Sequence, residues 1–117
     1  MKQFVGHVVR GVGRASRLGF ATVNIPLLDE SISGIYVGKV TTEGEEYIAA
    51  VFADPKRKIL EAHLLDFSGD LYGKEITVEL FEKIRESELF SDDVALKKSV
   101  DNDIARVREY FKNRSMY

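Results

Sequence analysis

The sequence predicts an all-β fold, a closed antiparallel barrel of five or six strands, followed by one C-terminal helix. Apolar and polar residues alternate through much of the first 84 residues, whereas apolar residues recur at helical spacing from Ser91 onward. The connections are short and carry glycine or polar residues, which leaves no room for crossover helices. Closing the sheet protects its edges. With 117 residues, 44% of them hydrophobic, we expect a single domain over residues 1–117.

Five stretches carry the strand pattern, namely residues 3–10, 34–42, 46–53, 58–67 and 74–84. In the last of them Ile76 and Val78 lie on one face, and Thr77 and Glu79 lie on the other. This alternation is typical of a sheet that buries one face in a core.

The helix is predicted from the spacing of Leu96, Val100, Ile104, Val107 and Phe111. Ser91 is the expected N-cap, and the two aspartates that follow it suit the first turn. We expect about five turns that pack an apolar stripe on the barrel.

Composition excludes several classes of protein. There is no run of eighteen apolar residues and no recognisable signal peptide, so we expect a cytoplasmic protein with no membrane partner. The absence of cysteine rules out disulfides and thiolate catalysis, and the two histidines make a histidine-rich metal site improbable. Any metal would therefore be held by oxygen atoms.

Charge is distributed unevenly along the chain. Residues 1–28 hold Lys2, Arg10, Arg14 and Arg17 and no acid, a charge of +4, whereas the remainder holds 13 basic and 19 acidic residues. The basic segment suits an anionic ligand such as phosphate. A small barrel that binds RNA is an alternative interpretation of this basic segment. The excess of acidic residues in the rest of the chain argues against a nucleic-acid partner.

The basic segment contains a glycine-rich loop, GVGRASRLGFATVN, at residues 11–24. Gly11, Gly13 and Gly19 allow successive backbone N–H groups to converge on phosphate oxygens, and Arg14 adds charge. The loop does not match the P-loop pattern, and its glycines could equally turn corners between strands.

Four further side chains could carry chemistry. Thr22 and Asn24 point the same way if their stretch is extended, and together they offer oxygen ligands for Mg²⁺, although both residue types also cap turns. Glu61 lies among apolar residues of a strand, where a carboxylate must be paired, hydrogen-bonded or kept as a base. His63 could be a second catalytic group or an ordinary buried histidine.

In their order along the chain, these segments resemble the riboflavin kinase (flavokinase) family. The resemblance runs from Gly6 to about Ala105, and four segments carry it: GHVVRGVGRASRLGFATVNI, SGIYVGKV, EAHLLDFSGDLYGKEITVELFEKIRESELF and ALKKSVDNDIARVREYF.

The resemblance implies a six-stranded antiparallel Greek-key barrel with a C-terminal helix. It also implies ATP-dependent phosphorylation of the riboflavin 5′-hydroxyl to FMN, with Mg²⁺ or another divalent cation as cofactor. The expected partners are riboflavin or FMN and ATP or ADP, and the expected state is a monomer.

The resemblance also assigns roles to particular residues. Glu61 is the expected catalytic base, and Arg85 is expected on the flavin side. Thr22 and Asn24 would hold the metal and the phosphates. The remaining nucleotide and phosphate contacts would come from Gly11, Gly13, Arg14 and Gly19.

Two departures from the family pattern motivate an alternative. Ala21 stands where the family motif has proline, and the stretch AVFADPKRKIL at residues 50–60 is shorter than the family's segment and lacks its glycine and threonine. The alternative is a non-catalytic barrel that binds flavin or nucleotide. No nucleotidyltransferase motif is present, so we expect FMN rather than FAD as the product.

Overall fold

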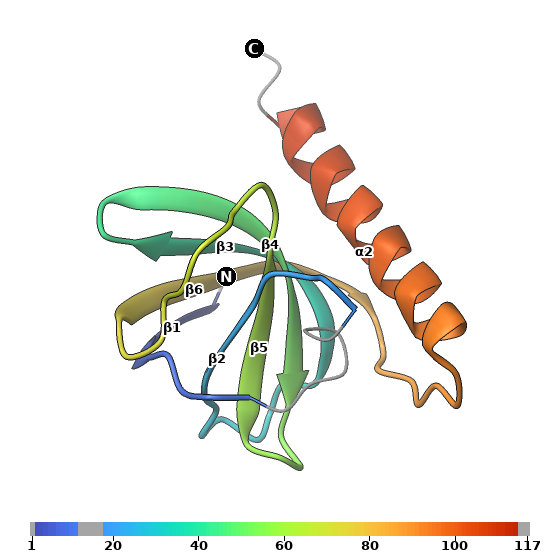
Figure 1. Ribbon diagram of the computed structural model, residues 1–117, viewed down its shortest axis with the longest axis horizontal. Helices are drawn as coiled ribbons and strands as arrows, with labels where there is room; N and C mark the ends of the chain where they lie inside the picture. Colours follow the sequence, from blue (N-terminus) through green and yellow to red (C-terminus); the bar gives the residue numbers. More distant parts are fainter. Residues whose placement is uncertain (1, 12–17, 115–117) are drawn as a thin grey trace.

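A computed structural model describes residues 2–11 and 18–114, and over these residues it contains one sheet and one helix (Figure 1). The elements are β1 (Lys2–His7), β2 (Thr22–Pro26), β3 (Gly34–Thr42), β4 (Glu45–Asp54), β5 (Ile59–Leu64), β6 (Glu75–Arg85) and α2 (Asp93–Arg114). The prediction of an antiparallel β fold with a C-terminal helix is confirmed.

The six strands pair in the order β1-β6-β3-β4-β5-β2, and every pair is antiparallel. Strands β3, β4 and β5 follow one another as hairpins, and β6 returns over residues 65–74 to lie beside β3, which is a Greek key. The sheet curls until its two edges approach each other, where the Val9 N–H donates to the Asn24 carbonyl at 2.8 Å. The fold is therefore an incompletely closed barrel.

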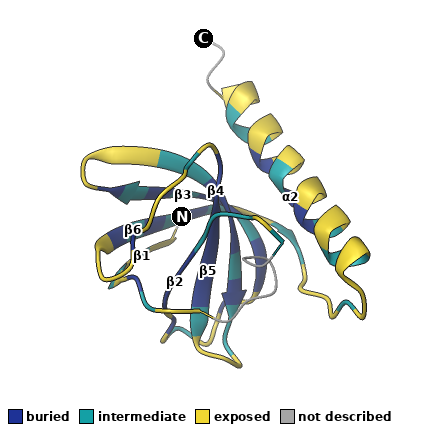
Figure 2. Ribbon diagram, viewed as in Figure 1, coloured by how far each residue is buried: buried dark blue, intermediate teal, exposed yellow. Residues whose placement is uncertain are grey.

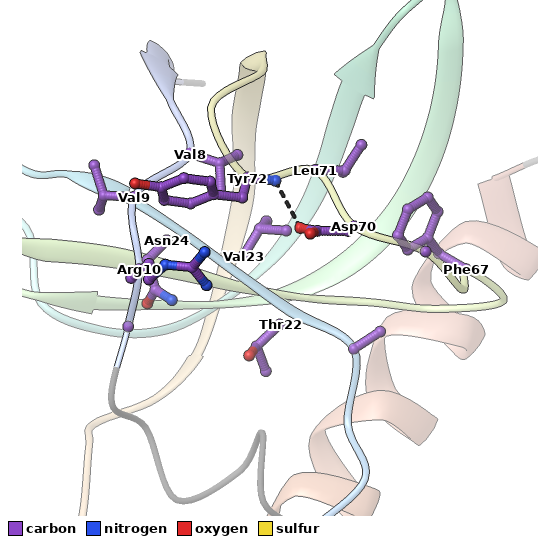
Figure 3. Close-up of a pocket in the computed structure, with 13 residues that line it drawn as sticks. Val8, Val9, Arg10, Thr22, Val23, Asn24, Phe67, Asp70, Leu71 and Tyr72 are labelled. Carbon is purple, nitrogen blue, oxygen red and sulfur yellow. Dashed lines mark hydrogen bonds between the residues drawn. The ribbon is translucent and has the colours of Figure 1, made fainter.

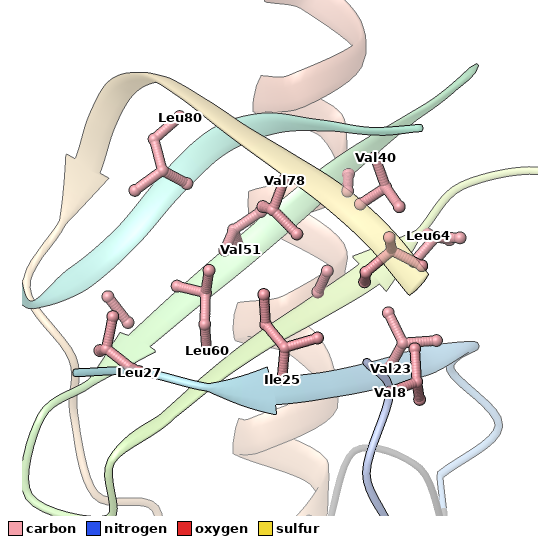
Figure 4. Packing of buried hydrophobic residues seen from close by; sticks show 14 of the residues in the cluster. Val8, Val23, Ile25, Leu27, Val40, Val51, Leu60, Leu64, Val78 and Leu80 are labelled. Atoms are coloured by element: carbon pink, nitrogen blue, oxygen red, sulfur yellow. The ribbon is translucent and has the colours of Figure 1, made fainter. Parts of the chain in front are cut away.

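The main core fills the concave side of the curled sheet (Figure 4). Ile25, Val40, Val51, Leu60 and Val78 are at most 1% exposed there. Along β2, β4, β5 and β6 the residues of this core occupy every second position, as the period-two pattern requires. Figure 2 shows the buried residues concentrated in the strands.

A second apolar cluster joins the convex side of the sheet to α2. Val37, Ala50 and Leu65 pack there against Val107 and Ile104 of the helix. The predicted apolar stripe is confirmed, since Val100 and Val107 are buried and the other three predicted positions are half-buried. Part of the sheet is thus covered on both faces.

The N-cap of α2 corrects the sequence prediction. Asp92, not Ser91, accepts the first-turn hydrogen bond, because its Oδ1 lies 2.7 Å from the Ala95 nitrogen. Both residue types cap helices well, so the sequence pattern alone could not separate two adjacent candidates.

The end of β5 also differs from the prediction. A strand was expected over 58–67, but β5 ends at Leu64, and Asp66 has a positive φ of 57°. This left-handed residue breaks the alternation of faces, so Leu65 packs toward α2 while Phe67 packs on the main core against Tyr47. The first strand similarly ends at His7 rather than residue 10.

Over the described ranges, no helix has the length and apolar character needed to span a membrane.

Candidate active site

The pairing of β2 with β5 gathers four polar side chains on one face of the sheet. Thr22 lies opposite His63, and Asn24 lies opposite Glu61. Opposed residues of an antiparallel pair point to the same side, and the alternate residues of both strands fill the main core. The extended conformation expected for Thr22 and Asn24 is confirmed, and the register adds Glu61 and His63 to the same small array.

Glu61 and His63 form a buried pair. Their side chains are 7% and 11% exposed, and Glu61 Oε1 lies 3.2 Å from His63 Nε2. The imidazole stacks on the Phe20 ring with centroids 6.1 Å apart and an interplanar angle of 13°. The other ring nitrogen, Nδ1, is buried without a hydrogen-bond partner among the described residues.

Gly11 lies directly against the Asn24 side chain. A Cβ at position 11 would come within 2.1 Å of Asn24 Nδ2, so close approach explains this glycine. Gly19 has a φ of +95°, a backbone conformation that other residues rarely adopt. Backbone conformation rather than close approach therefore explains this glycine. Two other predicted loop residues, Gly13 and Arg14, lie outside the described residues.

Thr22 and Asn24 line a cavity of about 260 Å³ on the side of the glycine-rich segment (Figure 3). Its other walls include Arg10, Gly11 and Tyr72. The Arg10 guanidinium lies 4.2 Å from the centroid of the Tyr72 ring. This cavity combines a cation, an aromatic ring, two neutral oxygen-bearing side chains and the Asp70 carboxylate, a set that suits a nucleotide with its divalent cation.

Glu61 and His63 line a second cavity of about 840 Å³, between the convex face of the sheet and the start of α2. Phe52, Leu89 and Phe90 supply apolar walls. Glu61 lines the larger cavity, and its register partner Asn24 lines the smaller one on the neighbouring strand. We refer to this position of Glu61, beside Asn24, as the junction of the two cavities.

Arg85 lines the second cavity, and its guanidinium is held by the helix. Nε and Nη2 donate to the two carboxylate oxygens of Asp103 at 2.9 and 2.7 Å, and Nη1 donates to the Glu86 carbonyl at 3.0 Å. The hydrogen bonds to Asp103 raise the pKa of Arg85 above its ordinary value, while partial burial acts in the opposite direction. Arg85, which is expected on the flavin side, therefore also joins β6 to α2 through its hydrogen bonds to Asp103.

Sequence reasoning missed three members of this neighbourhood. Phe20 stacks on His63, Asp103 holds Arg85, and Tyr72 lines the smaller cavity. Tyr72 follows a tight turn, in which Asp70 Oδ1 accepts the Tyr72 N–H at 2.9 Å. The one available signal was Asp103, which lies among the apolar positions of the predicted helix. An aspartate buried there requires a cationic partner.

A metal ion would find hard oxygen donors in the Thr22 hydroxyl and the Asn24 amide oxygen. Both side chains line the smaller cavity and come from consecutive outward positions of one strand. Such a donor set fits Mg²⁺, which keeps several waters and shares phosphate oxygens of its nucleotide.

The site thus consists of two neighbouring cavities on a small Greek-key barrel, one lined by Thr22 and Asn24 and the other by the buried carboxylate of Glu61. Comparison with known proteins makes the assignment specific. The chain belongs to the riboflavin kinase family, whose model matches residues 2–111.

One curated relative and one solved structure named as riboflavin kinases agree with this assignment, and a second solved structure with a different name shares the fold. The chain is 36% identical over 115 residues to the bifunctional riboflavin kinase/FMN adenylyltransferase of Escherichia coli K12, covering 91% of this chain and 37% of that protein. The riboflavin kinase of Trypanosoma brucei has a TM-score of 0.67 at 26% identity, covering 94% of this chain and 79% of that one. A Streptococcus pneumoniae structure titled macrolide-efflux protein has a TM-score of 0.77 at 26% identity, covering 91% and 38%. The chain spans well under half the length of its bifunctional relatives.

Proposed function

We propose that this chain transfers the γ-phosphoryl group of ATP to the 5′-hydroxyl of riboflavin and releases FMN and ADP. The observation that carries the proposal is the position of Glu61, a buried carboxylate at the junction of the two cavities. Family membership supplies the substrate class, and the two cavities supply separate places for donor and acceptor.

The smaller cavity would hold the nucleotide. Backbone N–H groups near Gly11 would approach the phosphates, with Arg10 supplying a cation and Tyr72 an aromatic surface. Thr22 and Asn24 would orient a divalent cation, which neutralises charge that develops on the phosphoryl group.

The larger cavity would hold the flavin. Its apolar walls suit a flat ring system, and Leu89 on its lining is fully exposed, so a bound ring can cover it. The ribityl chain would then extend along the sheet toward Glu61.

Glu61 would accept the proton of the attacking hydroxyl. Phosphoryl transfer through a loose transition state requires mainly in-line positioning and charge neutralisation, so a carboxylate at the junction of the two cavities is placed to orient the nucleophile. Burial in a strand with fixed pairing holds that carboxylate in one place.

The test is to incubate the purified protein with riboflavin, ATP and Mg²⁺ and to separate the flavins by chromatography. We expect FMN from the wild type and a decrease in kcat of about 10²-fold or more for Glu61→Gln, with nucleotide affinity unchanged. Glu82→Gln, an exposed glutamate of β6, is the control and should behave as wild type. Unchanged turnover in Glu61→Gln would remove Glu61 from the reaction.

The alternative, a non-catalytic flavin- or nucleotide-binding barrel, is motivated by Ala21 in place of the family's proline. The backbone at this position is nevertheless anchored, because the Ala21 carbonyl accepts the Leu64 N–H at 2.8 Å. This bond holds the backbone just before Thr22, which supports an active site. Saturable quenching of riboflavin fluorescence without FMN formation would instead favour the binding module.

A further inference from the structure

His63 has no part in the reaction described so far, yet its ring contacts the carboxylate at the centre of the site. We propose that His63 is a positioning residue that donates from Nε2 to Glu61 Oε1 and thereby aims the other carboxylate oxygen at the acceptor hydroxyl. This inference rests on the proposed function, since it concerns how Glu61 is held for phosphoryl transfer.

The direction of the hydrogen bond follows from the chemistry of the two groups. An ionised carboxylate can only accept, so the 3.2 Å contact requires the proton on Nε2. A second proton on Nδ1 would be a buried donor with no acceptor among the described residues. The neutral Nε2–H tautomer is therefore the form that fits this environment.

The imidazole is also held in orientation. Phe20 stacks almost parallel to it, Thr22 lies opposite it on β2, and only 8% of His63 is exposed. The Lys97 ammonium lies 5.9 Å from the Phe20 ring, which connects the stack to α2. These neighbours hold the plane of the imidazole ring in which Nε2 reaches Glu61.

One carboxylate oxygen is left for the substrate. Among the described residues, His63 is the only side chain that hydrogen-bonds to the Glu61 carboxylate. An oriented base depends on such a partner, because a displacement of about 1 Å can lower a rate by roughly 10²-fold.

The test compares His63→Gln, whose amide can reach the position of Nε2, with His63→Leu, which is similar in size and has no donor. Both variants lose the stack on Phe20, so their difference isolates the hydrogen bond. We expect His63→Leu to lower kcat about 10-fold or more with both KM values within about twofold of wild type, and His63→Gln to restore most of kcat. His7→Gln, which alters an exposed histidine of β1, is the control.

A second measurement does not depend on turnover. In a long-range ¹H–¹⁵N spectrum at mildly alkaline pH, His63 should show the Nε2–H tautomer, and His7→Gln assigns the two histidine signals. An Nδ1–H tautomer would overturn the proposal. Equal kcat values for His63→Gln and His63→Leu in a protein whose wild type makes FMN would also overturn it. A wild type that makes no FMN would refute the proposed function instead, a result separate from both.

Discussion

The ion pair between Arg85 and Asp103 joins the end of β6 to the middle of α2, and breaking it should loosen the helix. Two parallel hydrogen bonds connect the guanidinium to the carboxylate, and the two side chains are 25% and 7% exposed. Arg85→Ala would leave the Asp103 carboxylate buried without its partner. We therefore expect a large loss of stability from one substitution.

The magnitude follows from the burial of the pair. Removing one partner of a buried pair costs about 3–5 kcal/mol, and since water reaches a quarter of Arg85 we expect the lower end, about 3 kcal/mol. For a domain of this size that corresponds to a decrease in Tm of roughly 10 °C. The double variant Arg85→Met/Asp103→Leu removes both charges and should recover most of the loss.

Urea unfolding of the wild type, Arg85→Ala and the double variant measures the loss of stability and its recovery. Arg106→Ala, an exposed arginine of the same helix, should change the free energy of unfolding by less than about 0.5 kcal/mol. Equal losses for Arg85→Ala and Arg106→Ala would refute the reasoning. A raised KM for riboflavin with wild-type stability would instead assign Arg85 wholly to the substrate.

Three further predictions concern the smaller cavity and the contact of α2 with the turn at Asp66. Gly11→Ala should displace the Asn24 amide and weaken ADP binding about 10-fold. If this loss arises from Asn24, calorimetry should show that the double variant Gly11→Ala/Asn24→Ala binds ADP no more weakly than the single variant Asn24→Ala. Thr22→Ala should lower turnover and shift its dependence on Mg²⁺ to higher concentration, and an unaltered Mg²⁺ titration would contradict the assigned role. Arg108 donates to both carboxylate oxygens of Asp66 at 3.1 Å and lowers the pKa of that carboxyl. The stabilising contribution of this ion pair is therefore present at neutral pH, and it is lost as the pH falls through the folded-state pKa of Asp66. In an NMR titration, Arg108→Met should raise the Asp66 pKa toward its ordinary value.

Several residues of the candidate site could be named from the sequence, but the way they assemble could not. Thr22, Asn24 and Glu61 were identified from residue type, spacing and resemblance, and the structure brings them onto one face through the β2–β5 register. Phe20 was overlooked because an aromatic residue before a strand has many possible uses. Its partner His63 lies 43 positions away, a separation at which local pattern carries no information.

By itself, the sequence determined the fold class, the strand at 34–42, the helical stripe and the residue types of the site, because each depends on periodicity or chemistry within a short window. Only the tertiary structure decided the strand order, the edge contact between Val9 and Asn24, the turn at Asp66 and the pairs that join Glu61 to His63 and Arg85 to Asp103. These contacts connect distant parts of the chain, and their partners are set by the way the whole sheet curls and packs on one helix.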